Sequence, residues 1–327
     1  MKLLLIMPNF FDYPIQIKDE LCRLGYEVDF YDDRPSTNAI VKAIIRLKKD
    51  LINRYINKYF ESILNDIGDK KYDIVLLISG QSLSFNEQMI KRLRLIQGQA
   101  KFILYQWDSL TNFSYIKNIQ KYFDKCYSFD REDAEKNEKL EFLPLFYSQR
   151  YENIGKKNNK NFVYDFSFVG TAHPKKYKFI SEMSEKLKQV YSKQFIYFFF
   201  PSILVFFYRK IVNSEMKKAK YKEFNFIPLK EDEMNNVISN SRCILDCAQS
   251  GQSGLTIRVL EALGAKKKLI TTNKDIVNYD FYREENIYIY DGNFNFNSKF
   301  FDLPYIDIDE RIYKKYSLES WLKEILS

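Results

Sequence analysis

The sequence contains little histidine and cysteine, the residues from which zinc sites and disulfide frameworks are built. Among 327 residues there is one histidine, His173, and there are four cysteines, none of them in a C-x-x-C pair: Cys22, Cys126, Cys243 and Cys247. Neither a zinc site nor a disulfide framework is expected, and a reducing cytoplasm is the predicted compartment. Ten glycines, eight prolines and no low-complexity tract exclude a disordered chain.

Long apolar runs are also missing. The run near the N-terminus is interrupted by Pro8 and Asn9, so we interpret it as a buried strand and not as a signal peptide. The longest run elsewhere, residues 195–208, contains Pro201 and is shorter than the roughly 20 residues that a spanning helix needs. No membrane-spanning segment is predicted.

The charge is moderately basic, at +8, but it is spread along the chain. No RNA- or DNA-binding motif accompanies it, so we expect no nucleic-acid partner. The basic balance leaves open one class of alternative, a non-catalytic protein that binds nucleic acid or a sugar nucleotide.

What the sequence has in quantity is core material, with 46% hydrophobic and 17% aromatic residues. A chain of this length is natural for two domains of roughly 100 to 200 residues each. Apolar runs alternate with helical patterns, which is typical of parallel, doubly wound α/β sheets. The predicted strands are residues 3–7, 27–31, 74–79, 102–105, 126–129 and 141–143, and then 163–169, 195–200, 225–229, 243–247, 269–272 and 287–290.

These elements predict two Rossmann-like domains. The first spans residues 1–150 and the second 151–310, with a lysine- and asparagine-rich exposed connector at 151–161. Residues 311–327 end in a helix that opens with a capping box at Ser317.

A glycine-rich loop in the second domain is the clearest candidate for a binding site. Gly251 and Gly254 precede a predicted helix over residues 256–263, which Gly264 ends. Glycines let the backbone approach a ligand, and the helix N-terminus favours an anion such as a diphosphate. Arg258 and Glu261 share one helical face, where they either bind phosphate and ribose or form an ordinary structural ion pair.

Residues 252–261 (QSGLTIRVLE) and 267–273 (KKLITTN) resemble the nucleotide-sugar motif of GT-B glycosyltransferases, in particular bacterial capsular and lipopolysaccharide enzymes. The resemblance implies two Rossmann-like domains facing across a cleft, with the C-terminal helix packing back on the first domain. It assigns the ribose to Glu261, whereas Ser253 stands where the superfamily usually has an acid that touches the donor sugar. The donor-binding residues it implies are Gly170, Thr171, Lys175, Gln252, Ser253, Gly254, Leu255, Thr256, Arg258 and Glu261.

In the first domain, ligands are expected beyond the carboxyl ends of the strands. The residues there, which the resemblance places on the acceptor side, are Asn9, Asp12, Gly80, Gln81, Trp107 and Asp108. Asp108 follows a buried strand directly and is the candidate general base, although an Asp in that position is often the N-cap of the next helix. A similar Trp-Asp-Ser segment occurs in related bacterial enzymes. His173 is a second candidate base, but a hydrogen-bonding role toward the donor is favoured.

Two further segments raise the question of membrane contact. A helical pattern over residues 39–67 combines an apolar stripe, including Tyr55, with a basic face, including Lys42 and Arg46. Such a helix either lies on an anionic membrane or packs as an ordinary surface helix, and the second is favoured. The aromatic stretch at residues 195–208 is predicted to be core.

The predicted function is therefore transfer of a sugar from a nucleotide-sugar donor to a bacterial surface-glycan acceptor, lipid-linked by expectation, at the inner face of the plasma membrane. A GT-B-like sugar-nucleotide epimerase is the first alternative. We expect no cofactor, and no metal, because the Asp307-Ile-Asp309 triplet falls near the end of the chain and is interpreted as a surface turn.

Overall fold

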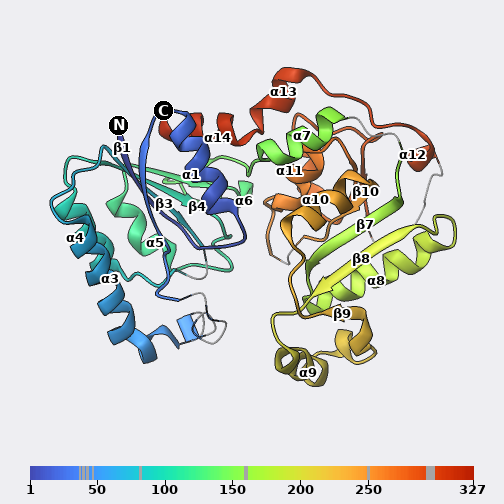
Figure 1. Ribbon diagram of the computed structural model, residues 1–327, viewed down its shortest axis with the longest axis horizontal. Coiled ribbons are helices and arrows are strands. Elements are labelled where there is room, and N and C mark those ends of the chain that lie inside the picture. Colours follow the sequence, from blue (N-terminus) through green and yellow to red (C-terminus); the bar gives the residue numbers. More distant parts are fainter. Residues whose placement is uncertain are drawn as a thin grey trace. The chain divides into compact units, whose positions relative to one another are not determined.

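The computed structural model describes residues 1–36, 38, 41, 44–45, 48–80, 83–157, 161–248, 251–291 and 299–327 (Figure 1). The chain forms two compact units. The first unit comprises Met1–Pro144 with Leu318–Ser327, and the second comprises Leu145–Ser317.

The first unit contains a six-stranded sheet in which all neighbouring strands are parallel. Its order is β2-β1-β3-β4-β5-β6, and in the centre Leu4 pairs with Val75 and Val75 with Phe102. The chain adds β2 on one side of β1 and β3 on the other, so the topological switch point of the sheet lies between β1 and β3. The strands are β1 (Lys2–Ile6), β2 (Glu27–Tyr31), β3 (Ile74–Ser79), β4 (Lys101–Gln106), β5 (Lys125–Ser128) and β6 (Glu141–Phe142).

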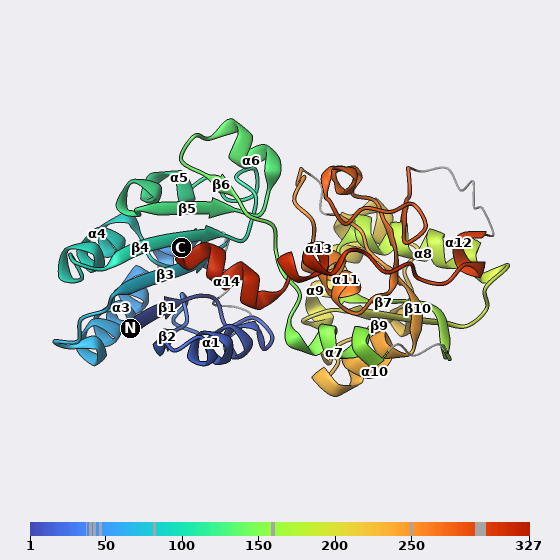
Figure 2. The ribbon, with the colours of Figure 1, turned by 90° about the horizontal axis from the view of Figure 1, so that it is seen from above.

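Helices cover both faces of this sheet (Figures 1 and 2). The face that carries Leu4, Val75 and Leu77 packs against α3 (Asn53–Ile67), α4 (Glu87–Ile96) and α5 (Ile116–Ile119). The short helix α6 (Arg131–Lys136) follows β5.

The other face is covered by α1 (Tyr13–Arg23) and by the C-terminal helix α14 (Leu318–Leu326). Trp321 of α14 is buried, and its ring centroid lies 4.7 Å from that of Tyr105 in β4. Glu319 of the same helix pairs with Arg23 of α1 at 2.8 Å. The chain end therefore belongs to the core of the first unit.

The second unit repeats the architecture with the strand order β12-β11-β10-β7-β8-β9, again entirely parallel. Its switch point lies between β7 and β10. The strands are β7 (Tyr164–Thr171), β8 (Gln194–Phe199), β9 (Phe224–Asn225), β10 (Ser241–Leu245), β11 (Lys268–Thr271) and β12 (Ile287–Ile289). The helices are α7 (Gln149–Lys157), α8 (Pro174–Lys188), α9 (Ile203–Val212), α10 (Glu231–Ser239), α11 (Ile257–Gly264), α12 (Lys299–Asp302) and α13 (Glu310–Lys315).

The predicted fold class is confirmed, and each predicted strand overlaps an observed one. β6 has only two residues, and β9 (Phe224–Asn225) shares only Asn225 with the predicted strand 225–229. The predicted connector at 151–161 is wrong in its first half, because residues to Lys157 form α7. Gly155 of α7 sits against the end of α11, where a Cβ atom would lie 2.5 Å from the Gly264 carbonyl oxygen. Gly264 is the last residue of α11, where the helix was expected to end, and it is also a packing residue, since a Cβ atom there would meet the Tyr147 ring.

The predicted continuous helix over residues 39–67 is also wrong. Lys48 has φ −154° and ψ 63°, outside the helical region, and a 3₁₀ turn, η1 (Lys49–Ile52), precedes α3. The buried stripe of α3 is one residue beyond the predicted one, because Ile56 and Phe60 are buried whereas Tyr55 is 47% exposed. Lys42 and Arg46, which belong to the predicted basic face, lie outside the described residues.

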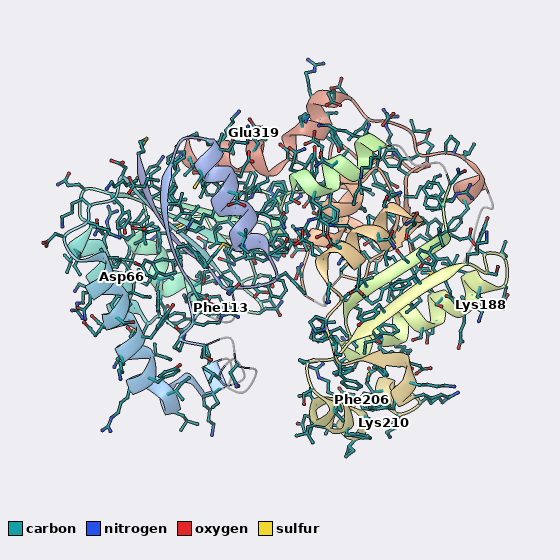
Figure 3. All side chains as sticks on the ribbon, in the orientation of Figure 1. Asp66, Phe113, Lys188, Phe206, Lys210 and Glu319 are labelled. Atoms are coloured by element: carbon teal, nitrogen blue, oxygen red, sulfur yellow. The ribbon has the colours of Figure 1, made fainter. Side chains whose placement is uncertain are left out.

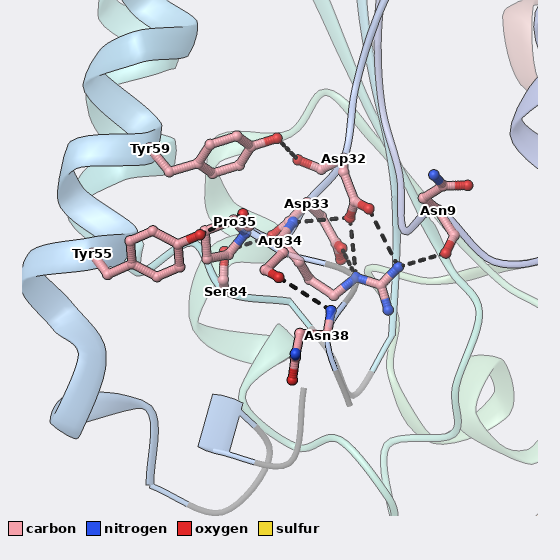
Figure 4. Close-up of polar contacts among 10 residues, drawn as sticks. Asn9, Asp32, Asp33, Arg34, Pro35, Asn38, Tyr55, Tyr59 and Ser84 are labelled. Carbon is pink, nitrogen blue, oxygen red and sulfur yellow. Dashed lines mark hydrogen bonds and ion pairs between the residues drawn. The ribbon is translucent and has the colours of Figure 1, made fainter. Parts of the chain in front are cut away.

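A buried polar cluster holds the end of β2 against the loop after β1 (Figure 4). Arg34 donates through Nε to Asp32 Oδ1 at 3.0 Å and through Nη2 to the Asn9 carbonyl at 2.8 Å. The same Nε lies 3.4 Å from Asp33 Oδ1, and the Asp33 side chain is fully buried. Burial raises the pKa of Asp33 well above its ordinary value, Arg34 works in the opposite direction, and the neighbouring Asp32 adds to the rise.

This raised pKa predicts a pH dependence of stability. The folded state holds the Asp33 proton more tightly than the unfolded chain, so its contribution to stability is complete below about pH 4 and declines as pH rises toward the folded-state pKa. Asp33→Asn removes this titration. We expect the free energy of unfolding of D33N, relative to wild type, to increase with pH above about 4, by at most about 1.4 kcal/mol per pH unit.

Urea unfolding at several pH values between 4.5 and 7.5 measures the difference. Asp69→Asn, an exposed aspartate of the same unit, is the control. A D33N difference that is constant across this pH range would contradict the assignment.

Candidate functional site

The candidate donor residues of the second unit follow the two strands at its switch point. β7 and β10 are parallel neighbours, with Ser167 paired to Ile244, so the loops after them leave the same edge side by side. Burial raises the pKa of Cys247, which lies two residues after β10, and Asp246 adds to the rise, whereas the Lys176 charge acts against it. Open α/β sheets bind ligands at this position.

The side chain of Asn273 holds the backbone of the glycine-rich loop, residues 251–254, by hydrogen bonds. This buried amide donates to the carbonyl oxygens of Ser253 at 2.9 Å and Gly254 at 3.2 Å. Gln252 donates to the Gly254 carbonyl as well, at 3.0 Å. Gly251 has φ 77°, a conformation that glycine adopts without strain. These hydrogen bonds hold the backbone at Ser253 and Gly254.

A buried carboxylate, Asp246, fixes the start of α11. It accepts the hydroxyl of Thr256 at 2.7 Å and that of Thr271 at 2.9 Å. Thr256 is the N-cap residue of α11, and within the described residues its side chain makes no capping hydrogen bond. The first N–H groups of a helix need partners from outside the helix, and they carry its positive dipole end. The arrangement suits an anion.

Arg258 and Glu261 lie together on α11, with Nη1 and Oε2 2.7 Å apart. Arg258 also donates to the Val169 carbonyl in β7 at 3.3 Å, and 19% of its side chain is exposed. Glu261 is buried, and after burial itself it is the main cause of the raised pKa of Tyr151 in α7. The pair thus joins α11 to β7 and α7, and part of the Arg258 side chain stays exposed at the switch point.

The loop after β7 is shorter than predicted. Gly170 and Thr171 belong to β7, and a Cβ atom on Gly170 would lie 2.9 Å from the Phe168 ring. His173 is the N-cap residue of α8 and Lys175 is exposed in its first turn. Leu255, another predicted donor-site residue, is buried beside the loop, so only its backbone is available to a ligand.

His173 is paired with Arg209 of α9, at 3.2 Å between Nδ1 and Nη1. A guanidinium group can only donate, so Nδ1 accepts and the ring proton of the neutral imidazole is on Nε2. A histidine in this state donates a hydrogen bond from Nε2, which suits a phosphate oxygen. The same state is unsuited to removing a proton from a substrate through Nε2.

In the first unit the structure brings Gly80 and Asp108 together. A Cβ atom on Gly80 would lie 2.8 Å from Asp108 Oδ2, so the glycine makes room for this carboxylate. Asp108 does not cap the next helix, because α5 begins at Ile116 with Tyr115 as its N-cap. Trp107 packs edge-on against Tyr13, with ring centroids 5.8 Å apart. Gln81 lies outside the described residues.

Asp12 and Asn9 have structural partners. Asp12 occupies the N-cap position of α1, and its carboxylate accepts from Gln16 Nε2 at 2.6 Å. Asn9 offers its carbonyl to Arg34 at 2.8 Å, which links it to the Asp32–Asp33–Arg34 cluster. Of the two predicted aspartates at this edge, Asp108 is kept as the candidate base because, unlike Asp12, it does not occupy the N-cap position of a helix.

Sequence reasoning missed the residues that support the site. Asp246 falls within a predicted strand and Asn273 within a motif segment, so the sequence pattern assigns a role to neither. The Asp32-Asp33-Arg34 run follows the second strand directly, which is the signal that identifies Asp108 and could also have identified this cluster.

Asp307 and Asp309 contact protein groups. Asp307 pairs with Lys266 at 2.6 Å, and Asp309 accepts from the Arg311 backbone N–H at 2.8 Å at the start of α13. In the described parts of the chain, no three His, Cys, Asp or Glu side chains are grouped as metal ligands would be. None of the helices in these residues has the length and hydrophobicity of a bilayer-spanning segment.

No family model matches this chain, and no curated protein matches it. Solved structures do. An alpha-glucosyltransferase in complex with UDP and a 13-mer DNA containing a central A:G mismatch has a TM-score of 0.55 at 14% identity, over 88% of this chain and 81% of its own.

The catalytic domain of starch synthase IV from Arabidopsis thaliana, bound to ADP and acarbose, has a TM-score of 0.54 at 8% identity, over 100% and 95% of the two chains. Anabaena Alr3699/HepE in complex with UDP-glucose has a TM-score of 0.53 at 9% identity, over 89% and 85%. At such identities the likeness shows the fold alone: the chain has the fold of GT-B glycosyltransferases, with two Rossmann-like domains.

Proposed function

We propose that this protein is a glycosyltransferase that moves a sugar from a nucleoside diphosphate sugar to a hydroxyl group of a glycan acceptor. One observation carries the proposal. The glycine-rich loop, the N-terminus of α11 and Arg258 converge at the switch point between β7 and β10. The similar structures hold UDP, UDP-glucose or ADP, which supports the same ligand class here.

The second unit would bind the donor. The diphosphate would lie at the N-terminus of α11, against the backbone of residues 251–254, with Arg258, His173 and Lys175 as side-chain donors. Glu261 would accept the ribose hydroxyls, since an ionised carboxylate is an acceptor only. Its present partner Arg258 would then share the carboxylate with the nucleotide.

The first unit would bind the acceptor and supply the base. Asp108 would take the proton of the attacking hydroxyl as its oxygen bonds to the anomeric carbon. The bond from that carbon to the diphosphate breaks, and its electron pair leaves with the nucleotide. This is an inverting displacement, in which general-base catalysis contributes typically 10² to 10⁴ in rate. Gly80 keeps the space that the Asp108 carboxylate occupies.

The leaving diphosphate needs positive charge as it departs. Arg258, Lys175 and the dipole of α11 can supply that charge without a divalent ion, so we propose a metal-independent reaction. The acceptor we propose is a lipid-linked bacterial surface glycan, and the enzyme would act at the inner face of the plasma membrane. The resemblance of residues 252–261 and 267–273 to capsular and lipopolysaccharide enzymes supports this acceptor class.

The first prediction from the proposed function concerns donor binding. Glu261→Gln and Arg258→Ala should each weaken nucleotide binding by about 1.5 to 3 kcal/mol, because each removes a charge-assisted hydrogen bond. Thermal-shift screening with UDP, GDP, dTDP, CDP and CMP identifies the base, and calorimetric titration then gives the affinities.

Arg311→Ala is the matched control, because Arg311 lies in the same unit with 93% of its side chain exposed. Arg258→Lys separates loss of the guanidinium geometry from loss of a buried partner for Glu261. If E261Q and R258A bind each nucleotide as tightly as wild type, the donor site lies elsewhere.

The second prediction concerns the base. Asp108→Asn should leave donor affinity nearly unchanged and lower turnover by about a hundredfold or more. Asp12→Asn is the comparison, and it should retain turnover because its carboxylate is engaged by Gln16. Product analysis with each nucleotide sugar provides the rates. Normal turnover by D108N would remove Asp108 from the mechanism, and a free epimerised nucleotide sugar formed without acceptor would indicate an epimerase.

The third prediction is that turnover survives EDTA, because the proposed charges around the diphosphate all belong to the protein. Activity with and without excess chelator is compared after dialysis. Complete loss that Mn²⁺ or Mg²⁺ restores would show that the leaving group depends on a metal ion.

A further inference from the structure

Helix α9 presents apolar side chains to solvent, although the aromatic stretch to which it belongs was predicted to be core. Among its ten residues only Phe206 is buried within the hydrophobic core. Leu204 is 80% exposed and Ile211 is 78% exposed. The exposed apolar residues of the helix are Ile203, Leu204, Val205, Phe207, Tyr208, Ile211 and Val212. An apolar surface of this density usually marks an interaction site.

The helix is nevertheless firmly attached to the second unit. The Phe206 ring lies 5.0 Å from that of Phe224 and 5.6 Å from that of Phe200, inside the aromatic core. Phe206 and Lys210, both from α9, are labelled in Figure 3. Ser202 caps the helix by accepting from the Leu204 N–H at 3.2 Å. Lys210 donates to the Ala219 carbonyl at 2.7 Å, which ties the end of α9 to the segment that follows. The apolar residues are thus held in place while exposed.

A basic rim accompanies this surface. Between residues 203 and 223 the sequence has six basic side chains and two acidic ones, Glu215 and Glu223. Glu223 is already engaged, because its carboxylate accepts from the Tyr177 hydroxyl at 2.8 Å and the Lys220 N–H at 2.7 Å. The exposed members of the rim are Lys217, Lys218, Lys220 and Lys222.

We propose that α9 and this basic rim form a docking surface for an anionic lipid bilayer. A helix of ten residues is only about 15 Å long, so it would lie in the interface with its apolar residues among the acyl chains and its lysines at the headgroups. A nucleic acid would match the lysines but not the apolar residues. A second copy of the chain would match the apolar residues but would bring two basic rims together, so charge complementarity favours the bilayer.

The surface also adjoins the candidate donor site. β8 is parallel to β7, with Phe199 paired to Thr171, so α9 begins at the sheet edge from which the β7 loop leaves. The contact between Arg209 and His173, at 3.2 Å, joins the two directly. Docking would therefore hold the donor loops near lipid headgroups, a consequence that rests on the proposed function, whereas bilayer binding itself does not.

Vesicle flotation with the full chain tests the docking surface without any measurement of activity. Wild type should bind vesicles of phosphatidylcholine and phosphatidylglycerol (1:1), and binding to pure phosphatidylcholine should be at least tenfold weaker. The double variant Leu204→Ser with Ile211→Ser should reduce binding to the anionic vesicles at least tenfold. Lys217→Glu with Lys218→Glu should reduce it about fivefold or more per lysine.

The matched control is Leu95→Ser with Val190→Ser, since these apolar residues are 73% and 71% exposed on other surfaces. Thermal unfolding shows that each variant is folded. The proposal is overturned if wild type does not bind anionic vesicles, or if L204S/I211S binds them as strongly as wild type does. It is also overturned if this variant abolishes a concentration-dependent dimer in sedimentation while leaving flotation unchanged, because the occupant would then be a second copy.

Discussion

The candidate donor site depends on the hydrogen bonds that two threonine hydroxyls donate to the buried Asp246. Burial of a carboxylate without hydrogen-bond partners lowers the stability of the folded state, so the hydroxyls of Thr256 and Thr271 are both needed beside Asp246. Because Thr256 is also the N-cap residue of α11, satisfying Asp246 fixes where that helix starts and takes the hydroxyl that would otherwise cap it. One buried interaction thus stabilises the fold and leaves the helix N-terminus suited to an anion.

Much of the fold could be predicted from sequence because it follows from local patterns. Central strands that are largely buried, such as β3 and β10, appear as short apolar runs, and the parallel architecture follows from their alternation with helices. The candidate site could be predicted in part for the same reason, since Asp108 closely follows β4, and Gly251, Gly254 and Arg258 lie in the loop and helix that follow β10. The first unit's Gly80 shows the limit: its role depends on a carboxylate 28 positions later in the chain.

The rest could not be predicted because it depends on contacts between distant segments. The composition of α7 is that of a linker, yet Tyr151 and Gly155 are buried against α11, where a side chain larger than glycine at 155 would clash. Gly264 has the sequence signature of a helix stop and serves as a packing contact for Tyr147. For α9 the sequence overestimates burial. Its composition is that of a core helix, but only Phe206 is buried, where it contacts aromatic residues of the interior.

The same sheet edge explains why binding and docking features of the second unit adjoin each other. In a parallel sheet all strands end at one edge, so every loop that can reach a ligand, and every helix that begins there, shares a limited surface. β7, β8 and β10 place three such segments together: the His173 loop, α9 and the glycine-rich loop. Because the Arg209 guanidinium can only donate, its contact from the α9 side favours the tautomer of a neutral His173 in which Nδ1 accepts. A displacement of α9 would therefore change the hydrogen-bonding state of a residue at the candidate donor site, which is a direct physical route by which contact with a surface can affect binding of a nucleotide.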